Sequence, residues 1–349
     1  MVALTLTDLF AVPALDRSLA PALQQALDGK AKPPGALGRI EDLALTLGLI
    51  QQRMLPVVER PVLLVFAGDH GLTRSGVAAF PSGVTVAMVD TLLAGRASAN
   101  AFARVVGAEV RVIDAGVAAD LSDRAGLVQA RIASGTADAS VEPAMTSAQA
   151  QAALLAGARV AGDAIASGAD LIALGEMGIG NSASAALLMH RLAPAPLDDC
   201  VGQGAGHSPE GMARKRAVLA QAAARSDATA PFEVLTQFGG YEIAMISGAL
   251  LAATRAGVPV LVDGFIGTAA ALLAVRLAPA ARDYCLFAHA SAEAGHRLML
   301  DAMTVRPLLQ LDMRLGEGTG ALLAMPLVKA ACALLSEVAE LSDVLEAAG

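Results

Sequence analysis

The sequence predicts an α/β fold with a mostly parallel sheet, on two observations. First, short apolar segments recur, each followed by a loop containing Gly or Asp and then by an Ala-rich helical stretch. Second, the clearest of these segments, Val62–Ala67, is apolar at consecutive positions, which is typical of a strand covered on both faces. Strands that alternate with helices indicate βαβ units, whose strands run parallel.

Five segments are predicted to be strands because each is short, apolar and followed by a turn signal. In chain order they are Val62–Ala67, Val110–Ala115, Asp170–Leu174, Val258–Val262 and Tyr284–Ala288. Helices are expected between them, over 84–105, from Ser182 onward and near 268–277. The stretch 137–148 is the expected irregular connection.

The two ends of the chain are predicted to be helical without intervening strands. Leu15–Gln52 and Ala321–Ala348 both have helical periodicity. They could pack together as a small helical layer. No low-complexity linker separates them from the rest of the chain.

Composition excludes several classes of protein. The chain has 349 residues, a formal net charge of −8 and no Lys/Arg cluster of the kind that forms a basic face, so nucleic acid is not an expected partner. The longest apolar runs are broken by Arg255 and Lys329 before they reach the length of a membrane span. Residues 1–14 lack a basic stretch before an apolar one, so no signal peptide is expected. Cys200, Cys285 and Cys332 are widely spaced, which predicts reduced thiols in a cytoplasmic protein and no metal site.

Polar residues follow every predicted strand. They are Asp69 and His70, Asp114, Glu176, Asp263, and finally His289 with Ser291. One such residue would be ordinary, because Asp is a common turn former. In parallel sheets, however, ligands bind beyond the carboxyl ends of the strands. Five strands that end in this way predict a shared polar cleft.

A glycine-rich loop, Gly175–Ser182, lies between a predicted strand and a predicted helix. Glycines let backbone N–H groups approach an anion, and a helix N-terminus favours negative charge, so a phosphate is one natural ligand. The alternative is a tight turn in which Asn181 or Ser182 caps the helix. The spacing does not decide between them. The loop matches neither the dinucleotide fingerprint nor the P-loop.

Three further turns contain glycines. Val201–His207 precedes a basic trio, Arg214–Arg216, which could contact a phosphate but is more often a solvated helix face. Phe238–Glu242 is a compact turn before a helix. Arg314–Gly320 places Glu317 between two glycines, which favours a functional carboxylate over a solvent-facing turn.

Taken together and in this order, seven stretches resemble the nicotinate-nucleotide–dimethylbenzimidazole phosphoribosyltransferases. They span residues 32 to 320 and are Lys32–Arg39, Ala67–Gly71, Gly175–Asn181, Phe238–Glu242, Asp263–Phe265, His289–Glu293 and Arg314–Gly318. The resemblance implies a homodimer of two-domain subunits. A Rossmann-like large domain would cover 56–320, and a small helical domain would combine 1–55 with 321–349. The substrates implied are nicotinate mononucleotide and 5,6-dimethylbenzimidazole, with no metal or cofactor, in cobalamin biosynthesis.

The resemblance also implies site residues. Glu317 would be the base that takes the proton from the incoming benzimidazole. Glu176 and Asp263 would hold the ribose hydroxyls or stabilise positive charge at C1′. Substrate contacts are expected from Gly178, Gly180, Asn181, Gly204, Lys215, Gly264, Ser291, Pro81, Ser82, Ala87 and Leu315.

The chain departs from the family's pattern after the Phe80-Pro81 pair. Gly83 and Ala87 stand where an acidic residue and a Gln are usual, and Arg96 stands where a Gly is usual. By resemblance, position 87 belongs to the wall of the base pocket, so we expect a more permissive pocket. Two alternatives remain: a paralogous partner subunit or non-catalytic base-binding protein of the same fold, and an oxidoreductase, against which the missing dinucleotide fingerprint counts.

Overall fold

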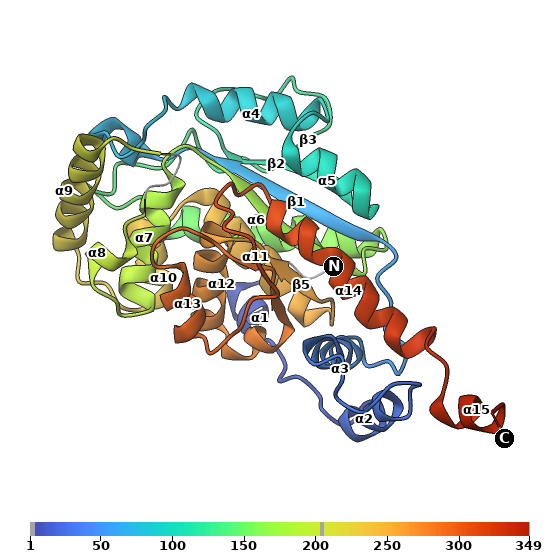
Figure 1. Cartoon of the computed structure of the whole chain (residues 1–349). Coiled ribbons are helices and arrows are strands. Elements are labelled where there is room, and N and C mark those ends of the chain that lie inside the picture. The colour runs from blue at the N-terminus through green and yellow to red at the C-terminus, as the bar shows by residue number, and fades with distance from the viewer. Residues whose placement is uncertain (1–3, 203–205, 349) are drawn as a thin grey trace.

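A six-stranded parallel sheet forms the centre of the computed structural model, which describes residues 4–202 and 206–348 (Figure 1). The strand order is β3-β2-β1-β4-β5-β6. Its members are β1 (Pro61–Gly68), β2 (Glu109–Gly116), β3 (Leu127–Gln129), β4 (Leu171–Met177), β5 (Val260–Val262) and β6 (Cys285–Phe287). The chain order reverses between β1 and β4, and the carboxyl ends of strands at such a switch point are where α/β proteins bind ligands.

All five predicted strands are present, so the α/β prediction is confirmed. The sequence did not reveal three strands of two or three residues, which are β3 and the separate pair β7 (His289–Ala290) and β8 (Leu309–Gln310). The helix expected over 84–105 is two helices, α4 (Gly83–Leu93) and α5 (Ser98–Val106). Gly95 separates them because its φ of 72° is a left-handed conformation that ends a helix.

Side chains of β1 alternate between two apolar cores. Val62, Leu64 and Phe66 pack on one face with α6 (Ser147–Ala166), α11 (Tyr241–Arg255) and α12 (Phe265–Leu277). Leu63, Val65 and Ala67 pack on the other face with α3 (Arg39–Gln51) and α14 (Thr319–Ser336). Burial on both faces explains why this strand is apolar at consecutive positions.

Small residues allow the helices of the first layer to pack closely. A Cβ atom on Gly157 of α6 would collide with the Met245 carbonyl of α11, and one on Gly248 would collide with the Leu154 carbonyl. The Ala-rich composition therefore reflects helix packing. The same layer contains α7 (Asn181–Leu192). The other elements in this part of the chain are η1 (Gly71–Ser75), α8 (Leu197–Cys200), α9 (Pro209–Arg225), α10 (Pro231–Phe238), η2 (Pro279–Tyr284) and α13 (His296–Ala302).

The two chain ends lie side by side, and Figure 1 shows α2 (Ala20–Asp28), α3 and α15 (Leu341–Glu346) at the same end of the molecule. Ala31 N–H donates to the Ala339 carbonyl at 2.8 Å, and Leu341 N–H donates to the Gly29 carbonyl at 2.8 Å. In contrast, α1 (Leu6–Phe10) packs on α6 and α11, with Leu9 buried in that core. We keep the division into 1–55 with 321–349 and 56–320 as a proposal.

One helix, α14, is long and apolar enough by length and composition to cross a membrane. Most of its surface is buried inside the fold, against α3, α5 and the end of β4. Its one charged residue, Lys329, donates to the Val106 carbonyl at 2.6 Å. These contacts make α14 a core helix.

Candidate active site

A cavity of about 550 Å³ opens at the carboxyl ends of β4, β5 and β6. Of the polar residues that follow the strands, Glu176, Asp263, His289 and Ser291 line it. Asp69, His70 and Asp114 do not; Asp114 lies near the end of β2 and accepts the Val117 N–H at 2.8 Å. Four of the predicted strand-end residues therefore share one cleft.

The turn that carries Glu317 needs its glycines. Gly316, Glu317 and Gly318 have φ angles of 89°, 62° and 81°, and such left-handed backbone favours glycine. A Cβ atom on Gly316 would collide with the Glu176 carboxylate, and one on Gly318 would collide with Leu63. The turn is thus packed directly against the sheet, and Glu317 itself adopts an uncommon conformation.

Asp263 anchors this turn. Its Oδ2 accepts the Gly318 N–H at 3.1 Å, and its Oδ1 accepts the Ala321 N–H at 3.0 Å. Nε2 of His289 lies 3.5 Å from Oδ1. Because both carboxylate oxygens bind the first residues of α14, Asp263 fixes the position of Glu317.

Glu317 is a buried carboxylate with a free oxygen. The residue is 5% exposed, and its Oε2 has no hydrogen-bond partner among the described residues. Burial raises its pKa, the Ala99 N–H opposes that shift, and nearby Asp263 adds to it. A carboxylate with a raised pKa that borders a cavity is suited to accept a proton there.

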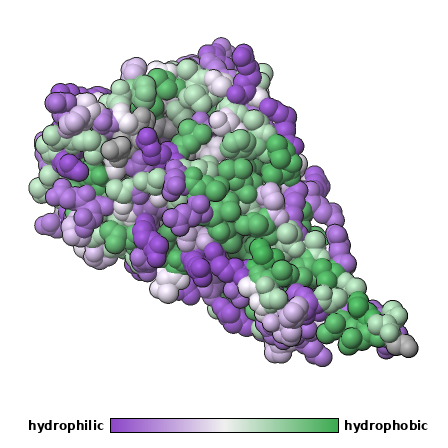
Figure 2. All heavy atoms as spheres, in the orientation of Figure 1, coloured by the Kyte–Doolittle hydropathy of each residue, from purple (hydrophilic) through white to green (hydrophobic). Residues whose placement is uncertain are grey.

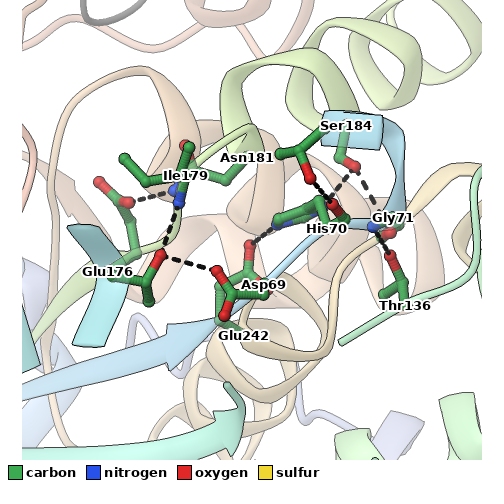
Figure 3. A network of polar contacts seen from close by, with 12 residues as sticks. Asp69, His70, Gly71, Thr136, Glu176, Ile179, Asn181, Ser184 and Glu242 are labelled. Atoms are coloured by element: carbon green, nitrogen blue, oxygen red, sulfur yellow. Dashed lines mark hydrogen bonds and ion pairs between the residues drawn. The ribbon is translucent and has the colours of Figure 1, made fainter. Parts of the chain in front are cut away.

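Glu176, at the end of β4, holds its proton to a higher pH than an ordinary glutamate. Burial, followed by the charge of Asp263, raises its pKa to about 8, and Glu242 and Glu317 add to the shift. The Asn181 amide donates a hydrogen bond to it and opposes the shift, as Figure 3 shows. At neutral pH the Glu176 carboxyl is therefore mostly neutral.

The glycine loop after β4 leads into α7. Gly180 is the N-cap residue with a φ of 93°, and no side chain caps the helix, so neither Asn181 nor Ser182 fills the capping role. A Cβ atom on Gly178 would collide with the Gly68 carbonyl at the end of β1. Gly178, Gly180, Asn181 and Ser182 line the cavity, so the positive end of α7 borders it.

Lys215 lies behind this loop and outside the cavity lining. Its side chain is buried, and Nζ donates to Ser182 Oγ at 3.0 Å and to the Gly202 carbonyl at 2.9 Å. Burial lowers the pKa of Lys215 to about 8. Its neighbours Arg214 and Arg216 are exposed, as expected of a solvated face. Gly204 lies outside the described residues.

The opposite wall is apolar and comes from α4 and the segment before it. Phe80, Val84 and Met88 line the cavity. The sequence placed Pro81, Ser82 and Ala87 here, but all three are exposed and absent from the lining. The reason is helical geometry: Val84 and Met88 are four residues apart and share a face, whereas Ala87 is turned about 100° away from Met88.

Most residues expected to bind substrate do meet in this cavity. Those in the lining are Glu176, Gly178, Gly180, Asn181, Asp263, Gly264, Ser291, Leu315 and Glu317. Those outside it are Pro81, Ser82, Ala87 and Lys215.

Two histidines to which the sequence analysis assigned no catalytic or substrate-binding role also lie at the site. His289 is 3% exposed and lines the cavity, and its Nδ1 has no hydrogen-bond partner among the described residues. His296 supports the loop after β7, because its Nδ1 accepts the Ser291 N–H at 2.8 Å and its Nε2 lies 2.8 Å from Thr268 Oγ1. Burial lowers the pKa of His296 to about 3, so it is neutral. The signal in the sequence that could have identified His289 is its position directly after the last predicted strand, Tyr284–Ala288.

The cavity offers no metal site within 4–202 and 206–348, where no group of three or more His, Cys, Asp or Glu side chains could hold an ion. Chemistry there would depend on carboxylates, a helix N-terminus and an apolar wall. Those features suit an enzyme that binds a phosphorylated, partly aromatic substrate.

This class agrees with the comparisons, because the family model described as phosphoribosyltransferase matches residues 12–344. The nicotinate-nucleotide–dimethylbenzimidazole phosphoribosyltransferase of Cupriavidus taiwanensis is 53% identical, over 95% of this chain and 96% of its own. The protein of that name from Dechloromonas aromatica is 50% identical, over 95% and 96%. The crystal structure of CobT from Thermus thermophilus superposes with a TM-score of 0.90 at 44% identity, covering 93% of this chain and 98% of that one. The chain belongs to the nicotinate-nucleotide–dimethylbenzimidazole phosphoribosyltransferase family.

Proposed function

We propose that this phosphoribosyltransferase moves the 5-phosphoribosyl group of nicotinate mononucleotide onto 5,6-dimethylbenzimidazole or a related base. The products are α-ribazole 5′-phosphate, a precursor of the lower ligand of cobalamin, and nicotinate. The observation that carries the proposal is the cavity itself. It brings the unpartnered carboxylate oxygen of Glu317 together with the N-terminus of α7 and an apolar wall.

The proposed reaction needs one base and no general acid. The pyridinium nitrogen of nicotinate mononucleotide leaves C1′ as a neutral pyridine. The benzimidazole attacks C1′ with one nitrogen, and the proton on its other nitrogen must be removed. We assign that proton to Glu317, because its raised pKa makes it a stronger base than an ordinary glutamate.

The other two carboxyl groups take different parts in this proposal. Asp263 holds the Glu317 turn through two backbone N–H groups, and the remaining lone pairs of its carboxylate are available to ribose hydroxyls. Glu176 is neutral at rest, so it can donate a hydrogen bond to a ribose hydroxyl as well as accept one.

We place the phosphate at the loop Gly178–Asn181, against the uncapped N-terminus of α7. Ser291 and Gly264 are proposed contacts from the neighbouring strand ends. Lys215 would act from behind, by holding Ser182 in place. The aromatic base would pack against Val84 and Met88, with Leu315 at the margin.

A cytoplasmic homodimer is also proposed. Figure 2 shows an apolar band on the face that carries α14, reaching to α15. On α15 the side chains of Leu341, Val344 and Leu345 are 39%, 47% and 63% exposed. A second copy that covers this surface would remove those side chains from water. Analytical ultracentrifugation that finds only a monomer at micromolar concentration would contradict the dimer.

The activity is tested by incubating the purified protein with nicotinate mononucleotide and 5,6-dimethylbenzimidazole and detecting α-ribazole 5′-phosphate by mass. We expect product with the wild-type protein, and none when either substrate is omitted. Binding of both substrates without any product would instead support a non-catalytic base-binding protein.

A further inference from the structure

Thr85 is a buried hydroxyl between the two walls of the cavity. It lies on α4, next to Val84 and three residues before Met88, which line the apolar wall. Thr85 is not part of the cavity lining and is 0% exposed. Thr85 Oγ1 donates a hydrogen bond to Asp69 Oδ1 at 2.7 Å and accepts one from the Ile179 N–H at 3.1 Å.

Asp69 ties this hydroxyl to the sheet. It directly follows β1, and its backbone N–H donates to the Gly116 carbonyl at the end of β2 at 3.0 Å. Its second carboxylate oxygen, Oδ2, accepts the Ala118 N–H at 2.8 Å. Figure 3 shows Asp69 beside Ile179 and next to the buried His70–Glu242 pair. The side chain of Asp69 therefore has one fixed orientation.

The Thr85 hydroxyl must act as donor and acceptor at once. A carboxylate oxygen can only accept, and a backbone N–H can only donate, so the group between them needs both functions. A hydroxyl has both, and a methyl group has neither. Removing it would leave Asp69 Oδ1 and the Ile179 N–H without these partners in a buried place, which is unfavourable.

We propose that Thr85 is a positioning residue that aligns the base wall with the nucleotide loop. The hydrogen bonds from Asp69 through Thr85 to Ile179 connect α4 to the loop that follows β4. Reaction between two bound substrates requires their reacting atoms to be held in line, so a small shift of one wall lowers turnover. This inference rests on the proposed function, because it assigns the two walls to two substrates.

The test compares four proteins. Thr85→Val keeps the shape of the side chain and removes the hydroxyl, whereas Thr85→Ser keeps the hydroxyl and removes the methyl. Thr91→Val is the matched control on the same helix, since the Thr91 hydroxyl donates only to the Ala87 carbonyl, at 2.7 Å. We expect Thr85→Val to lower kcat about 10- to 100-fold. Thr85→Ser and Thr91→Val should stay within about threefold of wild type, a change small against that loss.

Comparing kcat with the Kd of nicotinate mononucleotide and with the melting temperature separates a positioning role from a folding role. Each substrate keeps its own wall in Thr85→Val, so the calorimetric Kd of nicotinate mononucleotide alone should change by less than about threefold. A purely structural role would lower the melting temperature and leave kcat unchanged below it. If Thr85→Val does not fold, Thr85→Cys replaces it, because a thiol is only a weak hydrogen-bond donor and acceptor.

Hydrogen exchange at the Ile179 amide gives a readout that needs no substrate. We expect faster exchange in Thr85→Val and wild-type protection in Thr85→Ser. A wild-type protein that makes no product would overturn the proposed function, and the exchange data would still test the hydrogen bonds. An active wild type whose kcat is unchanged in folded Thr85→Val, or is lowered equally in Thr85→Ser, would overturn the role of Thr85.

Discussion

The two walls of the cavity are built in different ways. On the carboxylate side, Glu317, Asp263 and the loop Gly178–Asn181 lie on strand ends and tight turns, where a Cβ added to Gly178, Gly180, Gly316 or Gly318 would collide with neighbouring atoms. On the apolar side, α4 is partly exposed, and a Cβ added at Gly83 would meet nothing within 4 Å. The carboxylate side can therefore accept few substitutions without moving neighbouring atoms, whereas the apolar side can accept many.

The three positions at which the sequence departs from the expected family pattern all lie on or near the apolar wall. Gly83 and Ala87 are on α4, and Arg96 is in the turn that follows it. None of them alters the Glu317 turn or the loop after β4. From this difference we expect the transfer chemistry and the choice of base to be separable by mutation, and four predictions test the separation.

The largest effect is expected from Glu317→Gln. The substitution keeps size and removes basicity, so kcat should fall about 10²- to 10⁴-fold while the melting temperature changes little. Glu337→Gln, an exposed carboxylate at the far end of α14, is the matched control and should be silent. A loss of less than about tenfold in kcat would show that Glu317 is not the base.

The second largest effect is expected from a Gly→Val substitution on the carboxylate side, compared with the same substitution on the apolar side. Gly178→Val forces a side chain against the Gly68 carbonyl and displaces the proposed phosphate loop, so nicotinate mononucleotide should bind more than about tenfold more weakly, a loss of about 1.4 kcal/mol. Gly83→Val places the same side chain in open space and should leave that Kd unchanged. Calorimetry measures both, and equal affinities would place the phosphate elsewhere.

A third prediction concerns pH and stability. The pKa of Glu176 is about 8 in the folded protein against 4.5 for an ordinary glutamate. As pH rises from about 4.5 to 8, the unfolded chain loses this proton while the folded protein keeps it, so Glu176 progressively destabilises the fold; above 8 the penalty stops growing. Glu176→Gln cannot ionise. The urea midpoint of Glu176→Gln should therefore rise relative to that of the wild type as pH increases from about 4.5 to 8. A difference between the two midpoints that does not change with pH would mean that Glu176 is not protonated in the folded protein.

The smallest effect is expected at the apolar wall. Met88 lines the cavity and Ala87 does not, so Met88→Ala should alter the kcat/KM ratio of dimethylbenzimidazole to a bulkier benzimidazole. Ala87→Gln should shift it by less than about threefold, the size of a weak hydrogen bond. A competition assay with both bases in one tube reads the ratio directly. A larger shift of this kcat/KM ratio in Ala87→Gln would show that position 87 does contact the base.

Local patterns in the sequence were sufficient for the strands and for the strand-end carboxylates. Consecutive apolar residues, a turn signal and a following helix are properties of neighbouring residues, so they predict β1, β2, β4, β5 and β6 correctly. They also identified Glu176 and Asp263, because parallel strands bring their carboxyl ends to one edge, whereas Glu317 was identified by its place between two glycines and by the family resemblance.

Only the tertiary structure decided what each of these residues touches. Asp263 binds the start of α14, and Lys215 is buried behind Ser182, because elements far apart in sequence meet there. The rotation of α4 exposes Ala87 and buries Thr85 against Asp69. The sequence by itself thus determined which side chains gather at the edge of the sheet. Packing between distant segments determined their partners, their protonation and the wall to which each belongs.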